Sequence, residues 1–167
     1  MRTSIVLGAA ALTVVGAGVA PSAVGATDTQ SAPQITPIAR QFMTIVCPAD
    51  KWWKPVDKNW HKAYGKRKTV PDGTKVPKYL RNTYRKAAKA HLRAAQELTE
   101  VNWPATIAAD VSVEVDYYTT AFEWLNSRNT KRVSPTWLPW SSVTNDKKAW
   151  KNINQVLNLP NSCKGFT

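Results

Sequence analysis

Apolar residues recur at helical spacing through most of the chain and predict a succession of helices. The first apolar set favours a short helix near residue 35. It consists of Ile35, Ile38, Phe42, Ile45 and Val46. A second set, from Trp52 to Tyr64, shares one face of a helix that ends at Gly65, and the lysines fall on the opposite face. Pro55 fits this helix if it occupies the first turn, where a missing N–H is tolerated.

The two most regular patterns predict long helices over residues 77–101 and 104–127. Pro77 opens the first of these, and Asn102 is the expected cap of the second. The expected core face of the first is Leu80, Tyr84, Ala87, Ala88, His91, Ala95 and Leu98. The expected core face of the second is Ile107, Val111, Val115, Tyr118, Phe122 and Leu125.

A last helix is expected from about Asn145 to Asn158, where Pro160 stops the pattern. Its expected apolar positions are Val143, Trp150, Ile153, Val156 and Leu157. Residues 128–142 are expected to form an irregular crossover before it. Because no segment alternates as a half-exposed strand does, we predict an all-α fold, an irregular bundle of about four main helices.

The first 26 residues have the pattern of a cleaved secretory signal peptide. Arg2 precedes an uncharged apolar run from Ile5 to Ala20, and small residues end at Ala26. An uncleaved membrane anchor is the alternative, but the run is short for a bilayer span. We therefore expect a secreted protein, extracellular or associated with the cell envelope, with no transmembrane segment after cleavage. A flexible leader over 27–34 and a single helical domain over 35–167 complete the predicted organisation.

Export also explains the two cysteines, Cys47 and Cys163, which we predict to form one disulfide joining the tail to the start of the core. Closing so long a loop stabilises a fold by on the order of 4–5 kcal/mol in the chain-entropy model. Two thiols alone supply too few ligands for a metal, so no metal site is expected.

Charge is sorted along the sequence. The segment from Lys51 to Arg93 holds fourteen Lys and Arg residues, and its only acids are Asp57 and Asp72. The net positive charge of this segment therefore equals the formal net charge of the whole chain, +12. Such a field attracts polyanions. The residues expected to contact an anion are Lys54, Lys58, Lys62, Lys66, Arg67, Lys68, Arg81, Arg85, Lys89 and Arg93.

Catalytic and cofactor motifs are missing from the sequence. Its two histidines, His61 and His91, form no spaced ligand pair. We expect His61 to be solvated and His91 to be a hydrogen-bonded core residue. Neither Gly-rich phosphate loop is present, and no cofactor is expected. The sequence therefore favours a non-enzymatic protein.

A polar and aromatic strip borders the core face of the helix predicted over 104–127. It consists of Asp110, Glu114, Tyr117 and Trp124. Such a strip suits a ligand, or a glycan-acting enzyme built on the two acids. The favoured alternative is that the acids pair with cations of the preceding helix, because like charges one turn apart are otherwise destabilising.

Eight tryptophans are present, and most are expected to fill the core. Trp137 and Trp140 lie in the crossover, where capping the bundle end is favoured over exposure to sugar or lipid. The segment from Lys51 to Lys68 alternates Trp and Lys, as amphipathic helices on anionic membranes do. In a folded domain those tryptophans are expected to be buried.

The leading hypothesis is a secreted binding module that docks on an anionic cell-wall polymer or anionic lipid surface through its basic face. Nucleic acid satisfies the same electrostatics but, given export, is expected to bind in vitro only. The rivals are a membrane-active or inhibitory protein, which uses the Trp and Lys segment, and a carboxylate enzyme, which uses Asp110 and Glu114.

Overall fold

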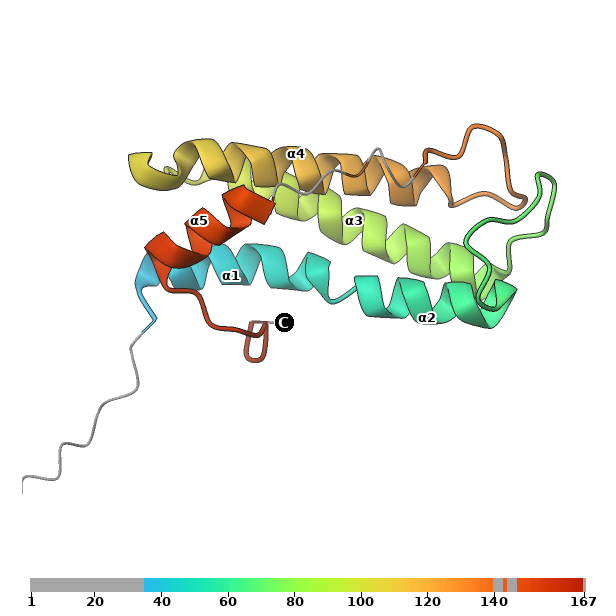
Figure 1. The fold of residues 1–167 in the computed structure, drawn as a ribbon, viewed down its shortest axis with the longest axis horizontal. Helices are drawn as coiled ribbons and strands as arrows, with labels where there is room; N and C mark the ends of the chain where they lie inside the picture. Colours follow the sequence, from blue (N-terminus) through green and yellow to red (C-terminus); the bar gives the residue numbers. More distant parts are fainter. Residues whose placement is uncertain (1–34, 140–142, 144–146, 167) are drawn as a thin grey trace, which may run out of the picture. The chain divides into compact units, whose positions relative to one another are not determined.

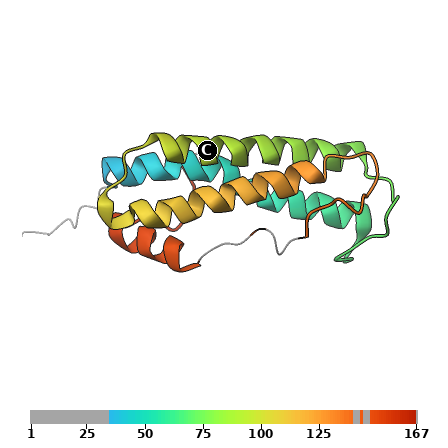
Figure 2. The ribbon, with the colours of Figure 1, turned by 90° about the horizontal axis from the view of Figure 1, so that it is seen from above.

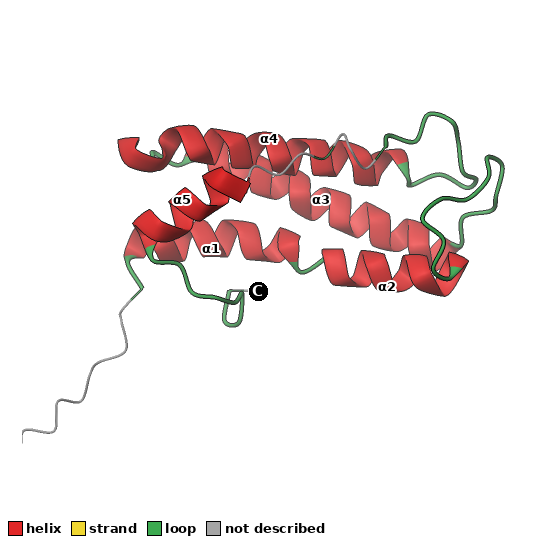
Figure 3. Cartoon of the chain, viewed as in Figure 1, coloured by secondary structure: helices red, strands yellow, loops and turns green. Residues whose placement is uncertain are grey.

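The computed structural model describes residues 35–139, 143 and 147–166. Within them lie five α-helices: α1 (Pro37–Asp50), α2 (Trp53–Tyr64), α3 (Lys78–Glu100), α4 (Ala105–Ser127) and α5 (Lys147–Leu157). Helices joined by loops make up this part of the chain (Figure 3). The predicted all-α class is confirmed. The predicted signal peptide, the leader, Trp140 and Asn145 lie outside the described residues.

The helices α3 and α4 run antiparallel and share the most extensive contact between helices (Figures 1 and 2). Residues 101–104 connect them. Along α3, α1 and α2 follow one another, each in contact with it, while α5 packs on α4. This arrangement leaves the outer faces of α2 and α3 toward solvent.

A turn at Lys51 and Trp52, just before Pro55, separates α2 from α1. Proline has no N–H, so it cannot donate to the carbonyl of Lys51 as a continuous helix requires. The helical hydrogen bonding is interrupted at Lys51 and Trp52, and Val56 then donates to the Trp52 carbonyl at 3.0 Å. Pro55 thus lies in the first turn of α2, as predicted. Gly65 ends α2 with φ of 65°, a conformation that favours glycine.

Two clusters of buried side chains form the core. The first joins α1 and α5 to the second half of α3 and part of α4, and its almost fully buried members include Phe42, Leu98 and Ile153. The second joins α2 to the other halves of α3 and α4, with Leu80 and Leu125 fully buried. All seven residues of the predicted core face of α3 are buried, which confirms that prediction.

The buried face of α4 is rotated relative to its prediction. Glu114 and Trp124 are buried, whereas Val115 and Phe122 are only partly so. The helix packs against α3 and α5 on two sides, so its buried face is wider than one apolar stripe. Two smaller predictions were wrong. Pro104, not Asn102, is the N-cap of α4, and Val156 is 46% exposed.

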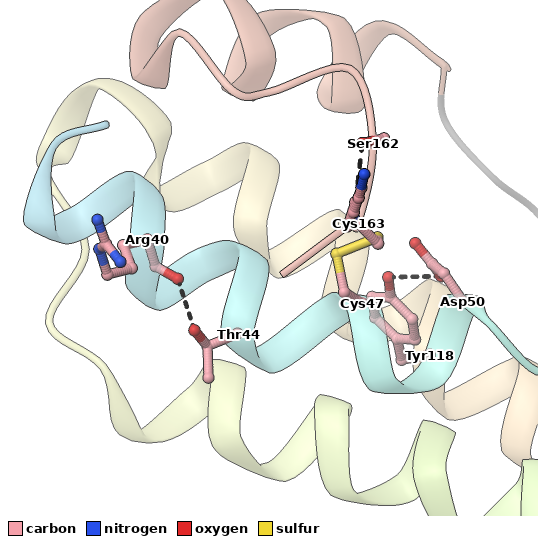
Figure 4. The surroundings of a disulfide bond; sticks show 8 residues. Arg40, Thr44, Cys47, Asp50, Tyr118, Ser162 and Cys163 are labelled. Carbon is pink, nitrogen blue, oxygen red and sulfur yellow. Dashed lines mark hydrogen bonds between the residues drawn. A yellow bond between two sulfur atoms is a disulfide. The ribbon is translucent and has the colours of Figure 1, made fainter. Parts of the chain in front are cut away.

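The disulfide joins Cys47, near the end of α1, to Cys163 in the tail, with their Cα atoms 5.4 Å apart (Figure 4). Cys47 is fully buried, and Phe166, three residues beyond Cys163, packs on the first core cluster. The predicted link between the tail and the start of the core is confirmed.

Candidate functional site

The ten predicted anion-contacting residues lie on α2, on α3 and on the loop between them, and we call them the cationic face. Its members are Lys54, Lys58, Lys62, Lys66, Arg67, Lys68, Arg81, Arg85, Lys89 and Arg93. Nine of them are exposed, and Arg81 is partly buried. The lysines of α2 are exposed because Val56, Trp53 and Trp60 turn the opposite side of that helix toward the core.

Contacts between α2 and α3 bring their two rows of cations together. Lys62 Nζ lies over the ring of Tyr79, 4.9 Å from its centroid. On the same pair of helices, Asn59 Nδ2 donates a hydrogen bond of 2.8 Å to Thr83 Oγ1. The outer faces of the two helices therefore adjoin.

The basic loop at residues 66–68 is held against α2. Trp60 Nε1 donates to the carbonyl of Arg67 at 2.6 Å, and the Tyr64 hydroxyl donates to the carbonyl of Lys75 at 3.2 Å. The Trp60 and Tyr64 rings also contact each other edge to face, 4.8 Å apart. These contacts fix the loop backbone and leave its three cationic side chains in solvent.

Few of these charges are neutralised within the described part of the chain. Arg93 is the member of the cationic face that forms an ion pair there, with Glu97 one turn along α3 at 2.5 Å. Asp57 contacts His61, at 3.3 Å, rather than a lysine. The other members keep their charge toward solvent, where an anion can reach them.

A second candidate site is an acid–aromatic pocket of about 500 Å³. Its lining comes from the end of α1, the start of α2, α4 and α5. The lining residues are Asp50, Trp53, Glu114, Tyr117, Tyr118, Lys147 and Trp150. An adjacent pocket of about 440 Å³ shares Trp53 and Tyr117 with it and extends to Trp60 and Trp124.

Burial shifts the acid–base properties around the acid–aromatic pocket. It raises the pKa of Asp50 to about 6, and a hydrogen bond from Tyr118 opposes that shift. Burial, with the nearby Asp50 and Glu114, raises the pKa of Tyr118 well above its usual value. Next to Tyr118, buried His91 donates from Nδ1 to the Ala87 carbonyl at 2.8 Å, and burial lowers its pKa to about 4. His91 is therefore the hydrogen-bonded core histidine that the sequence predicted.

The predicted polar and aromatic strip is divided by the structure. Glu114 and Tyr117 line the acid–aromatic pocket, and Trp124 lines the adjacent one. Asp110 lines neither and accepts a hydrogen bond from Asn152 Nδ2 of α5. The expected pairing of Asp110 with a cation of α3 is not found in the described residues.

The sequence did not identify Asp50, Tyr118 or Trp53 as pocket residues. Asp50 is the last residue of α1 and precedes Tyr118 by 68 positions in the sequence. Only the packing of α1 on the bundle brings the two side chains together. The apolar spacing of α4 had identified Tyr118 as a core residue, which it is, and its polar end gave no separate signal.

Arg128 is a structural cation that the sequence also did not distinguish from the exposed ones. Its guanidinium lies 3.7 Å from the Trp124 ring centroid and 5.0 Å from that of Trp137. Its Nη1 donates to the carbonyl of Leu138 at 2.8 Å, and burial lowers its pKa to about 10. Trp137 is only partly exposed and donates from Nε1 to Thr130 at 3.0 Å.

Within the residues that the structure describes, no group of three or more His, Cys, Asp or Glu side chains is placed to hold a metal ion. No helix among them is long and apolar enough to cross a bilayer. The chain has no significant match among protein-family models, curated proteins or solved structures.

Proposed function

We propose that the protein is a non-enzymatic binding module whose cationic face docks on an anionic polymer of the cell envelope. The observation that carries this proposal is that nine of ten cations on two adjoining helices and their loop are exposed. Arg93 alone among them has an acidic partner in the described part of the chain. The predicted export signal makes an envelope polymer the expected partner, and nucleic acid is expected to bind in vitro only.

A polymer is favoured over a lipid surface because the cationic face carries little exposed apolar area. In the described residues the exposed large hydrophobic side chains are Tyr79, at 37%, and Val156, at 46%. The tryptophans of α2 pack on the second core cluster, so the helix does not offer them to a membrane. Charge attraction without insertion suits a flexible chain of repeated negative charges.

The arrangement does not support a hydrolase built on Asp110 and Glu114. Asp110 is hydrogen-bonded to α5, and Glu114 alone of the two lines the acid–aromatic pocket. Paired carboxylates need a shared substrate site to divide the roles of acid and base.

The test is binding of fluorescently labelled polyphosphate to the oxidised protein at increasing NaCl. Affinity should fall about tenfold or more for a threefold rise in salt, because counterions are released on binding. The variant K66Q/R67Q/K68Q should bind more weakly than a matched variant, R40Q/K151Q/K164Q, which loses the same charge at exposed positions outside the cationic face. Salt-insensitive binding, or equal losses in both variants, would contradict the proposal.

The same protein separates the lipid alternative. Oxidised protein should leave vesicles of phosphatidylglycerol intact, because the tryptophans of α2 pack on the second core cluster. Release of an entrapped dye by the intact protein would favour the membrane-active rival and count against polymer docking.

A further inference from the structure

A pocket of about 540 Å³ lies at the N-terminus of α3, and we call it the cationic notch. It adjoins the cationic face, with which it shares Arg81. Four of its six described lining residues are cations: Lys75, Lys78, Arg81 and Lys131. The other two are Val76 and Pro77, and no acid is among them. Lys75, Lys78 and Lys131 are exposed, so the charges surround an opening rather than a packed interior.

The fold holds these cations in place by joining two loops. Val76 donates from its backbone N–H to the Lys131 carbonyl at 2.9 Å, and Val133 donates to the Thr74 carbonyl at 2.8 Å. An isolated antiparallel bridge pairs Lys75 with Arg132. Val76 is only 2% exposed and anchors this junction in the second core cluster.

The electrostatics of the notch are unfavourable without an anion. Its cations gather at the N-terminus of α3, which carries the positive end of the helix dipole and has no acid in its first turn. The described residues form no ion pair with any of the four. In addition, Arg81 Nε is buried and has no hydrogen-bond partner among them. An unsatisfied buried donor costs free energy that an acceptor on a ligand recovers.

We propose that the cationic notch binds a phosphate group carried by the anionic polymer, an inference that rests on the function proposed above. A phosphate presents several acceptor oxygens in different directions, which matches ammonium groups from two loops and α3 together with one guanidinium. The volume exceeds that of one phosphate, leaving room for the adjoining part of the chain. A phosphate-bearing polymer is thereby favoured over one that carries carboxylates.

Titration of the oxidised protein with inorganic phosphate at constant ionic strength tests the site. Saturable NMR shifts are expected at the backbone amides of Val76 and Lys78. The variant K78Q/K131Q should bind phosphate about tenfold more weakly. The matched variant K54Q/K58Q loses the same charge on α2 and should stay close to wild type. Absence of saturable shifts, or equal losses in both variants, would overturn the site.

Arg81 supplies a sharper comparison because its charge can be kept. R81K retains the cation but loses the planar set of donors, so phosphate binding should weaken, whereas R85K at an exposed position one turn further should change little. Thermal unfolding by circular dichroism establishes that both variants are folded. If R81K binds phosphate as wild type does, the guanidinium has no part in the site.

Competition distinguishes the source of the phosphate. Polyphosphate that displaces inorganic phosphate from the notch supports a polymer ligand, whereas displacement only by phosphatidylglycerol vesicles would overturn the polymer and assign a lipid headgroup. Displacement by neither would refute the link to docking. Failure of the proposed function is recognised separately, since polyphosphate binding would then be absent or insensitive to salt while the notch still binds inorganic phosphate.

Discussion

The hydroxyl of Tyr118, on α4, donates a hydrogen bond of 3.0 Å to Oδ1 of Asp50, the last residue of α1 (Figure 4). Burial raises the pKa of Asp50 to about 6, and this hydrogen bond acts in the opposite direction by stabilising the carboxylate. Because the pKa of Tyr118 is itself raised well above its usual value, its hydroxyl stays protonated throughout the titration of Asp50.

Replacing Tyr118 by Phe should raise the pKa of Asp50 above its value of about 6. The change removes the hydrogen bond that favours the charged form and leaves the burial that disfavours it. A pH titration of the Asp50 carboxyl carbon by NMR measures the shift. Tyr79→Phe, at an exposed position on α3, is the control and should leave the value unchanged. A lower or unaltered pKa in Y118F would show that the hydrogen bond does not stabilise the carboxylate.

Asp50 should make the fold less stable as pH rises from about 4 to 6. Its folded pKa lies above the unfolded value of 3.8, so in this range the folded state holds a proton that the unfolded state has lost. Relative to Asp50→Asn, the unfolding free energy of wild type should fall by about 3 kcal/mol across this window. Urea unfolding at successive pH values measures the difference. A difference that does not depend on pH would contradict the raised pKa.

His91 should have the opposite effect in almost the same window. Burial lowers its folded pKa from 6.5 to about 4, so between these values the unfolded state binds the extra proton and stability rises with pH. Relative to His91→Asn, whose amide can still donate to the Ala87 carbonyl, wild type should gain about 3 kcal/mol from pH 4 to 6.5. The slope is the readout, since the lost contact with Trp53 lowers stability equally at every pH. A slope equal to that of wild type would refute the buried neutral histidine.

Much of the fold follows from local patterns in the sequence. The apolar spacing of α3 predicted its buried face, and the position of Pro55 predicted where α2 begins, because both depend on the geometry of a single helix. The disulfide followed from there being two cysteines in a chain expected to be exported. The exposed lysines of α2 followed from the same helical wheel as its buried Val56.

What the sequence did not reveal depends on how the helices meet. Asp50 and Tyr118 belong to different helices, and no spacing rule connects them. The cationic notch likewise needs a backbone pairing between two loops, which brings Lys131 into the lining of the same pocket as Lys78 although neither loop has a strand pattern. In the sequence Arg128 cannot be distinguished from an exposed cation. Only its enclosure between Trp124 and Trp137 in the structure shows that it differs.

The disulfide should contribute on the order of 4–5 kcal/mol to the free energy of unfolding, because it restrains an unfolded loop of 116 residues. The variant C47A/C163A, compared with the oxidised protein in urea, should show this loss of stability. The cavity left by the buried Cys47 sulfur should add to the loss. A larger denaturant dependence is also expected, since the unfolded chain expands without the crosslink. Wild type under a reducing agent is the matched control without a cavity. Equal midpoints for oxidised and reduced wild type would contradict the prediction.

Arg128→Lys should destabilise the fold by about 2 kcal/mol although it preserves the charge. The guanidinium is stacked near Trp124 and Trp137 and donates to the Leu138 carbonyl, and a lysine ammonium reproduces neither the planar stacking nor the set of donors. Arg85→Lys, at an exposed position on α3, is the matched control and should change stability by less than about 0.5 kcal/mol. Urea unfolding followed by tryptophan fluorescence measures both variants, and equal stabilities would show that Arg128 acts through its charge alone.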